Sequence, residues 1–248
     1  MINLIISILI GAAGWVASAF IFDSIWTGII PFFIFGIVSF FLLNRRTANK
    51  LKVIMSRFQT MMENIQKIPS EQAKKNQIEK AINVLKEGYA YKNHQFFLKQ
   101  QLNSQLGSIY YMQKKFDEAE PYLKDSFIQP GTPRAMYACI LFRRKKEDEM
   151  IKQFELAVKL DRRTPLLWNV YAWCLNELKK RDEAIAVLNR CLANNAGDKT
   201  TQDNLNLLKN SGKVKMKSYE MLWYQFLLED PPRQMIMMNP NSKRPMFR

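Results

Sequence analysis

The residue types that do most enzyme chemistry are few in this sequence, and they stand apart. His94 is the only histidine, and no acid or cysteine lies within one helical turn of it. A general acid or base needs a second group to orient it, so His94 is better explained as an exposed or capping residue. Carboxylates adjoin at Asp117-Glu118 and Asp182-Glu183, where we expect the first turn of a helix, a position that acids favour. We therefore expect no catalytic residue.

The cysteines and the short motifs give no sign of a cofactor either. Cys139, Cys174 and Cys191 are odd in number and far apart in the sequence, so they form neither a disulfide framework nor a zinc-binding motif. No glycine-rich nucleotide loop, zinc-protease helix motif or hydrolase elbow occurs. We expect a protein that is not an enzyme, holds no metal and no cofactor, and works in a reducing compartment.

Helical periodicity runs through the chain after residue 44, and no segment alternates like a strand. Within it, one pattern repeats over residues 100–198. The recurring residues are Leu106, Gly107, Tyr110, Phe116, Ala119, Tyr122 and Ser126 in the first copy, Tyr137, Ala138, Leu141, Phe154 and Ala157 in the second, and Trp168, Tyr171, Ala172, Ala184, Leu188 and Cys191 in the third. Ala157 lies 34 residues before Cys191 and 31 residues after Ser126, a spacing that is typical of stacked helix pairs.

This pattern resembles the tetratricopeptide repeat family. The resemblance implies an all-α fold, an α-solenoid of helix pairs in which each pair buries its apolar face against the next. Small residues such as Gly107 and Ala172 are expected where two helices come close. Asn103 and Arg134 depart from the pattern, because the first helix of a repeat usually has a large apolar residue at these positions.

The repeat domain is expected to span residues 99–230. A helix after Asp198, closed by Ser211-Gly212, is predicted to cap the last repeat. Residues 217–229 are predicted to form a packed final helix, because their large apolar side chains share one helical face. Residues 231–248 are predicted to be a basic tail without fixed structure.

Residues 1–43 are expected to form a transmembrane helical hairpin. They contain no basic residue and a single acid, Asp23, which separates the apolar runs 2–22 and 25–43. As a helix, each run is long enough to cross about 30 Å of hydrocarbon. Two alternatives stay open, a cleaved signal peptide over residues 1–19 and a hairpin that enters one leaflet without crossing it.

Residues 44–98 are expected to form basic amphipathic helices beside the membrane. The basic residues that precede the first acid of this region, and that we expect to contact lipid head groups, are Arg45, Arg46, Lys50, Lys52 and Arg57. Such a cluster stays on the cytoplasmic side, which predicts an integral protein, as in a bacterial inner membrane, with a cytoplasmic repeat domain. The apolar stripe of residues 47–65 either lies on the bilayer or packs on the next helix.

The family resemblance also implies a binding site, because these repeats bind protein segments in the concave face that the first helix of each repeat lines. Tyr111, Phe142 and Trp173 are expected there as a ladder of rings that either docks a peptide or covers the core between repeats. The expected partner-binding groove consists of Gln101, Ser108, Tyr111, Met112, Phe142, Arg143, Asn169, Trp173, Asn176 and Glu177.

We therefore expect a membrane-anchored scaffold or adaptor that recruits a protein partner, or assembles a complex, at the cytoplasmic face of a membrane. The net charge of +15 supports an alternative, a module that holds RNA, ribosomes or DNA near the membrane through phosphate contacts. Against it, the basic residues are scattered over helices and no RNA-binding motif occurs. The expected partners are proteins and membrane lipids, with nucleic acid as the alternative.

Overall fold

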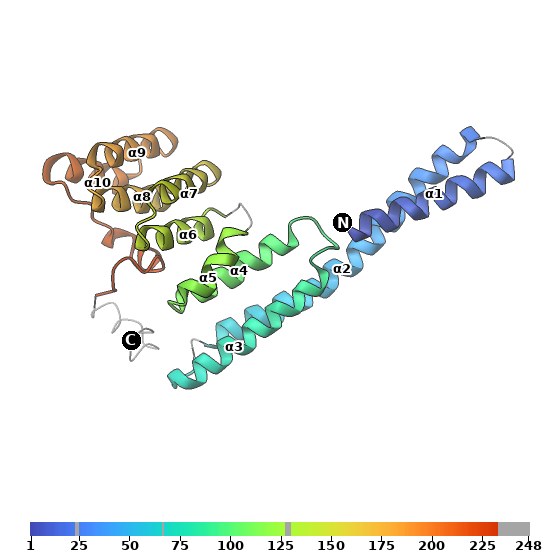
Figure 1. The fold of residues 1–248 in the computed structure, drawn as a ribbon, viewed down its shortest axis with the longest axis horizontal. Helices are drawn as coiled ribbons and strands as arrows, with labels where there is room; N and C mark the ends of the chain where they lie inside the picture. The colour runs from blue at the N-terminus through green and yellow to red at the C-terminus, as the bar shows by residue number, and fades with distance from the viewer. Residues whose placement is uncertain (23–24, 66, 127–129, 233–248) are drawn as a thin grey trace. The chain divides into compact units, whose positions relative to one another are not determined.

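A computed structural model describes residues 1–22, 25–65, 67–126 and 130–232, and the chain divides into two compact units, Met1–Leu102 and Asn103–Arg248. Among the described residues all regular structure is helical (Figure 1), and the helices pack in consecutive pairs. This confirms the all-α solenoid. The predicted tail lies outside the described residues from residue 233 onward.

The first unit begins with a helical hairpin. Helix α1 (Ile2–Phe22) packs along the first part of α2 (Ile29–Ile65), with a 3-10 turn, η1 (Ile25–Gly28), before α2. The helices touch through small residues, since a Cβ on Gly11 would lie 2.7 Å from the carbonyl oxygen of Phe32. Both helices are long and apolar enough to cross a membrane. In the most apolar stretch of each helix, only 17% and 6% of the residues are buried.

Helix α2 differs from the prediction of two separate helices. It runs without a break through the basic stretch that follows residue 43, because Asn44, Arg45 and Arg46 include no proline or glycine that would end a helix. Pro31 lies in its first turn, where the missing N–H costs little. The apolar hairpin helix and the basic amphipathic helix are therefore one rigid element.

The amphipathic part of α2 is covered by α3 (Glu71–Glu87). Its apolar stripe is buried at Leu51, Ile54, Phe58 and Ile65, so the second of the two alternatives, packing on the next helix, describes this stripe. Helix α3 begins after Ser70, whose side chain accepts a hydrogen bond from the Ala73 N–H and caps the helix. A 3-10 turn, η2 (Gly88–Tyr91), follows α3.

Three helix pairs and a capping helix then follow one another in the order that the repeats predict (Figure 1). The pairs are α4 (Leu98–Met112) with α5 (Phe116–Lys124), α6 (Thr132–Arg143) with α7 (Glu147–Leu160), and α8 (Pro165–Glu177) with α9 (Arg181–Asn194), and the cap is α10 (Lys199–Ser211). The cap ends at Gly212, whose φ of +66° suits a glycine and whose N–H bonds to the Leu208 carbonyl. The predicted cap is confirmed.

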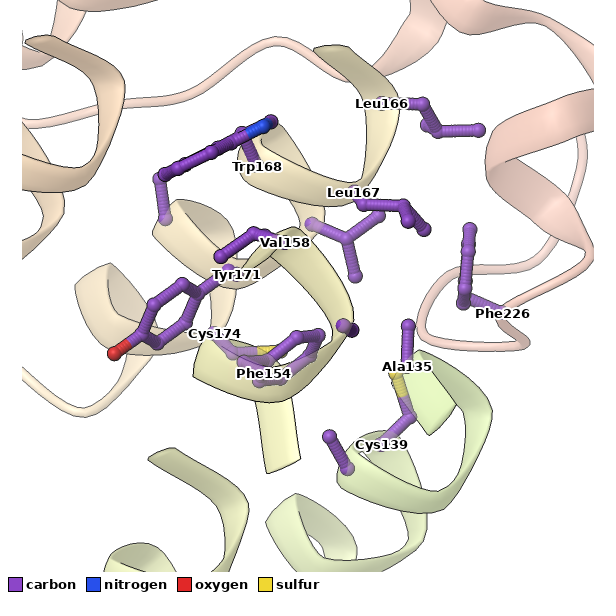
Figure 2. Packing of buried hydrophobic residues seen from close by; sticks show 14 of the residues in the cluster. Ala135, Cys139, Phe154, Val158, Leu166, Leu167, Trp168, Tyr171, Cys174 and Phe226 are labelled. Atoms are coloured by element: carbon purple, nitrogen blue, oxygen red, sulfur yellow. The ribbon is translucent and has the colours of Figure 1, made fainter. Parts of the chain in front are cut away.

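Small residues bring the paired helices together in the second unit. A Cβ on Gly107 would lie 2.7 Å from the Leu123 side chain, and one on Gly131 would lie 2.7 Å from the Ala157 carbonyl oxygen. Large side chains fill the remaining space, as where the rings of Phe154 and Tyr171 stack at 5.0 Å. Figure 2 shows this cluster.

The two departures from the repeat pattern have a shared explanation in the structure. Asn103 is buried, and its side-chain amide donates to the Asp125 carbonyl at 2.9 Å. Arg134 donates to the carbonyls of Lys124 and Ser126. Both polar side chains therefore bind the end of α5, where helix carbonyls need donors.

Each turn inside a helix pair has a lysine where glycine would be expected. Lys114, Lys145 and Lys179 have φ values of 61°, 58° and 66°. In each turn the next residue's N–H bonds to the carbonyl five positions back, as Lys146 does to Leu141 at 2.9 Å. This bond closes the helix end around a left-handed residue. The three lysines follow the spacing of 31 and 34 residues noted in the sequence.

Replacing Lys145 with glycine will raise the free energy of unfolding of the second unit by about 0.5–1 kcal/mol. The left-handed conformation costs a non-glycine residue roughly 1–2 kcal/mol, which the substitution relieves. The greater conformational freedom of glycine in the unfolded chain offsets about 0.5–1 kcal/mol of this stabilisation. Thermal unfolding of the purified protein measures the change. Lys152→Gly inside α7 is the control and will lower stability by about 1 kcal/mol; equal losses in both variants would contradict the prediction.

Candidate functional site

The first helices of the three pairs, α4, α6 and α8, carry the predicted aromatic ladder. Phe142 on α6 and Trp173 on α8 meet edge to face with centroids 5.9 Å apart. Tyr111 on α4 is fully buried, and its ring meets Phe116 at 5.3 Å. All three rings are at least half-buried.

The chain's own C-terminal segment, residues 213–230, occupies this face. Trp223 and Phe226 are fully buried, and Trp223 meets Trp173 edge to face at 5.3 Å. The Tyr111 hydroxyl donates a hydrogen bond to the Phe226 carbonyl. In Figure 2, Phe226 belongs to the same buried cluster as Ala135 of α6. The segment therefore completes the core that the ladder begins.

Two charged contacts hold the far end of this segment. The Arg143 guanidinium donates to the Leu227 carbonyl, and its centre lies 5.0 Å from the Phe116 ring. The Lys114 ammonium lies 3.8 Å from the Asp230 carboxylate. Both pairs are exposed, so we expect them to position the segment more than they stabilise it.

A buried network of amides holds the near end of the segment. Asn169 is fully buried on α8, and its Nδ2 donates to the hydroxyls of Thr201 and Tyr219, both at 2.8 Å. Its Oδ1 accepts from Asn204 at 2.8 Å, and the Asn204 Oδ1 accepts from the Lys215 N–H at 2.8 Å. One side chain of the predicted groove thus joins α8, the capping helix and the C-terminal segment.

Beside the segment the same face keeps an open cavity of about 550 Å³. Three residues of the predicted groove, Trp173, Asn176 and Glu177, line it. The other charged side chains around the cavity are Lys179, Arg181, Lys213, Lys215 and Glu229. Basic groups outnumber acids there, so the cavity favours an anionic occupant.

One comparison with known proteins identifies a repeat in the chain. Residues 166–198, which contain α8 and α9, match the tetratricopeptide repeat family. This segment is a tetratricopeptide repeat. No curated protein and no solved structure matches the chain. Tetratricopeptide repeats are typically interaction scaffolds rather than enzymes, and the helix pairs that precede the match extend the same architecture.

Of the remaining predicted groove residues, some take part in the fold and others lie on the surface. The Ser108 hydroxyl bonds within α4 to the Ser104 carbonyl, and Met112 packs on the core. The Asn176 amide donates to the Gly212 carbonyl at 3.1 Å. Gln101 is exposed. Of the predicted ladder, Phe142 and Trp173 touch each other, and Tyr111 and Trp173 both contact the chain's own segment.

Sequence reasoning missed the form of that segment. Residues 217–229 are not one helix but a 3-10 turn, η3 (Lys217–Tyr219), and a short helix, α11 (Met221–Tyr224). The prediction was wrong because Glu220 and Leu227 have positive φ values of 50° and 52°, which interrupt a helix. Trp223 is buried as a result, while its neighbour Leu222 is 60% exposed.

The ionisable groups of the site are tuned by burial. Burial raises the pKa of Tyr111 well above its usual range, and also raises the pKa of Tyr219. Burial likewise raises the pKa of the Cys174 thiol. All three native cysteines are free and buried, a setting that keeps thiols unreactive. These groups stay neutral at physiological pH and serve packing.

The basic residues predicted to face lipid lie on the exposed side of α2. Arg45, Arg46 and Lys52 are exposed, and the Lys50 ammonium lies 5.7 Å from the Tyr91 ring centre. Arg57 pairs with Glu87 of α3 at 3.2 Å. In the described part of the chain, no group of three acids, histidines or cysteines is arranged to hold a metal ion.

Proposed function

We propose that this protein is a membrane-anchored scaffold that binds an acidic segment of a partner protein and holds it at the cytoplasmic face of a membrane. The repeat architecture supports an interaction role. The single observation that carries the choice of partner is the open basic cavity at Trp173, Asn176 and Glu177, because the rest of the aromatic face holds the chain's own segment.

The hairpin supports the membrane part of the proposal. The apolar side chains of α1 and of the first part of α2 point mostly outward, which is unfavourable in water and favourable in lipid. Arg45 and Arg46 follow the apolar part of α2 directly, and this favours the cytoplasm for the chain that follows. Confinement to the membrane raises the effective concentration of a bound partner there.

The charges around the cavity support an acidic partner. Lys179, Lys213 and Lys215 are exposed at its edge, so a carboxylate-rich segment gains attraction as it approaches. The Trp173 ring, half-buried beside them, offers an apolar surface for a neighbouring side chain. Other basic residues are engaged within the domain: Arg190 pairs with both carboxylate oxygens of Glu155 at 2.7 Å and thereby lowers the pKa of Glu155.

A photo-cross-linking residue at Glu177, in the full-length protein in its native membrane, tests the proposal. We expect a protein adduct whose linked peptide is rich in Asp and Glu. Reversing two charges with Lys213→Glu and Lys215→Glu will weaken its capture by about tenfold or more, since rim charges govern encounter. Lys152→Glu, an exposed reversal on α7, is the matched control and will leave capture unchanged.

Two results would overturn this function. One is an adduct that survives the double reversal at full yield, which would remove charge as the basis of binding. The other is an adduct of nucleic acid, recovered only at low salt, which would favour the phosphate-binding alternative. Recovery of the protein in the soluble fraction instead of the membrane fraction would separately contradict the proposed membrane anchoring.

A further inference from the structure

In the first unit, the loop of residues 92–97 is fixed to the open end of the apolar hairpin. The Ile2 N–H donates to the Asn93 carbonyl at 2.8 Å, and the Met1 ammonium group donates to the same carbonyl. The loop therefore caps the N-terminus of α1, because its Asn93 carbonyl accepts from donors that have no partner inside the helix. The position of the loop along the hairpin follows from these bonds.

The same end of the hairpin is where the apolar surface stops. Asn3 is buried there, and its amide donates to the side chains of Asn44 and Thr47 at 3.1 and 3.2 Å. Beyond Asn44 the next residues of α2 are Arg45 and Arg46. In a membrane-anchored chain this polar cluster marks the boundary between hydrocarbon and head groups.

The loop continues the apolar surface at that boundary. Met1, Leu4, Phe40 and Asn44 of the hairpin share one cavity of about 270 Å³ with loop residues 94–96. Phe96 and Phe97 are 50% and 58% exposed beside it, and their ring centroids lie 6.5 Å apart. Two adjacent exposed phenylalanines are costly in water.

The backbone at Phe97, which carries the second ring, is strained. Phe97 has a φ of 60°, a left-handed conformation that is an outlier for a bulky side chain. Strained backbone of this kind persists where the surroundings require it. Lys92 and Lys99 flank the two rings in the sequence, which gives the loop the aromatic and basic composition of segments that lie in a membrane interface.

We infer that residues 92–97 are an interfacial anchor whose Phe96 and Phe97 side chains insert into the lipid bilayer beside the hairpin. The inference rests on the proposed membrane anchoring and extends it. The occupant is lipid rather than protein, because the exposed rings continue the lipid-facing surface of α1 and α2 at the level where that surface ends. The anchor holds the residues that follow α3 and η2 at the membrane surface.

Spin labels on single introduced cysteines test the inference in the full-length protein. The protein is reconstituted in vesicles of phosphatidylcholine and phosphatidylglycerol in equal parts, and collisions with oxygen and with a water-soluble nickel complex give the depth of each label. Labels at Phe96→Cys and Phe97→Cys are expected about 5–10 Å below the head-group boundary. The native cysteines are buried, so the introduced thiol takes the label.

Two further labels separate the possible failures. Val53→Cys is the matched aqueous control, because Val53 is also 58% exposed but lies about 14 Å beyond Asn44 along α2. Phe41→Cys, 65% exposed on the hairpin, reports the membrane anchoring itself. A label at 41 that stays in water would remove the anchoring on which the inference depends.

The loop inference fails alone if the label at 41 is deep while those at 96 and 97 match the aqueous label at 53. It also fails if the labels at 96 and 97 are shielded from both oxygen and nickel, since that result would mean a protein contact. Thermal unfolding of each labelled variant, compared with the unlabelled protein, verifies that all four are folded.

Discussion

Replacing Trp223 with alanine will lower the free energy of unfolding of the second unit by about 3–5 kcal/mol, the range for a buried tryptophan. Trp223 is fully buried. Its ring packs on Trp173, and its indole N–H donates to Glu229 at 3.0 Å. The substitution removes this side chain from the core and leaves a cavity beside Trp173.

The adjacent residue supplies the control for this result. Leu222 lies on the same short helix but is 60% exposed, so Leu222→Ala will change stability by less than about 0.5 kcal/mol. Denaturant unfolding followed by circular dichroism measures both variants. Equal small losses would mean that the C-terminal segment is a loosely held ligand and not part of the core.

The prediction bears on where a partner binds. A tetratricopeptide groove is usually open to external peptides, but here residues 213–230 fill the aromatic part with two fully buried rings. A partner that displaced them would have to replace that buried area and also the hydrogen bonds to the Phe226 and Leu227 carbonyls. Binding in the adjacent open cavity avoids this cost, which is why we place the partner there.

Much of the fold could be predicted from the sequence because local rules act at single residues. The close contacts at Gly107, the cap at Ser70 and the left-handed end at Gly212 each follow from the chemistry of one residue type. The continuity of α2 could also have been predicted from the lack of a breaker after residue 43. Both halves of α2 were correctly predicted to be helical, but the prediction placed a boundary after residue 43, where the composition changes.

The aromatic site was harder to predict, because its occupant depends on contacts distant in the sequence. The Tyr111 hydroxyl meets a carbonyl 115 residues away, and no periodic pattern encodes such a bond. The positive φ of Glu220 and Leu227 gave no signal either, since neither is glycine or asparagine. The large apolar residues of this segment did predict packing, though on a helix that the structure does not form.

Asn169→Ala will lower the free energy of unfolding of the second unit by about 2–4 kcal/mol, because it breaks a buried hydrogen-bond network. The substitution leaves the Asn204 amide without its acceptor, and it removes the amide that donates to the Thr201 and Tyr219 hydroxyls. These buried polar groups then lack hydrogen-bond partners, and water cannot easily take the place of the missing amide. The loss will appear in thermal unfolding, with the capping helix and the C-terminal segment released together.

Asn176→Ala separates this structural role from a role in binding. Asn176 is half-buried and donates one hydrogen bond, to the Gly212 carbonyl at 3.1 Å, so its loss will cost only about 0.5–1.5 kcal/mol. Because Asn176 also lines the open cavity, the same variant will weaken cross-linking at Glu177 more than it weakens the fold. A small stability loss in Asn169→Ala, equal to that in Asn176→Ala, would instead place Asn169 in an open groove. The two asparagines, seven residues apart on α8, therefore distinguish the internal core from the proposed binding cavity.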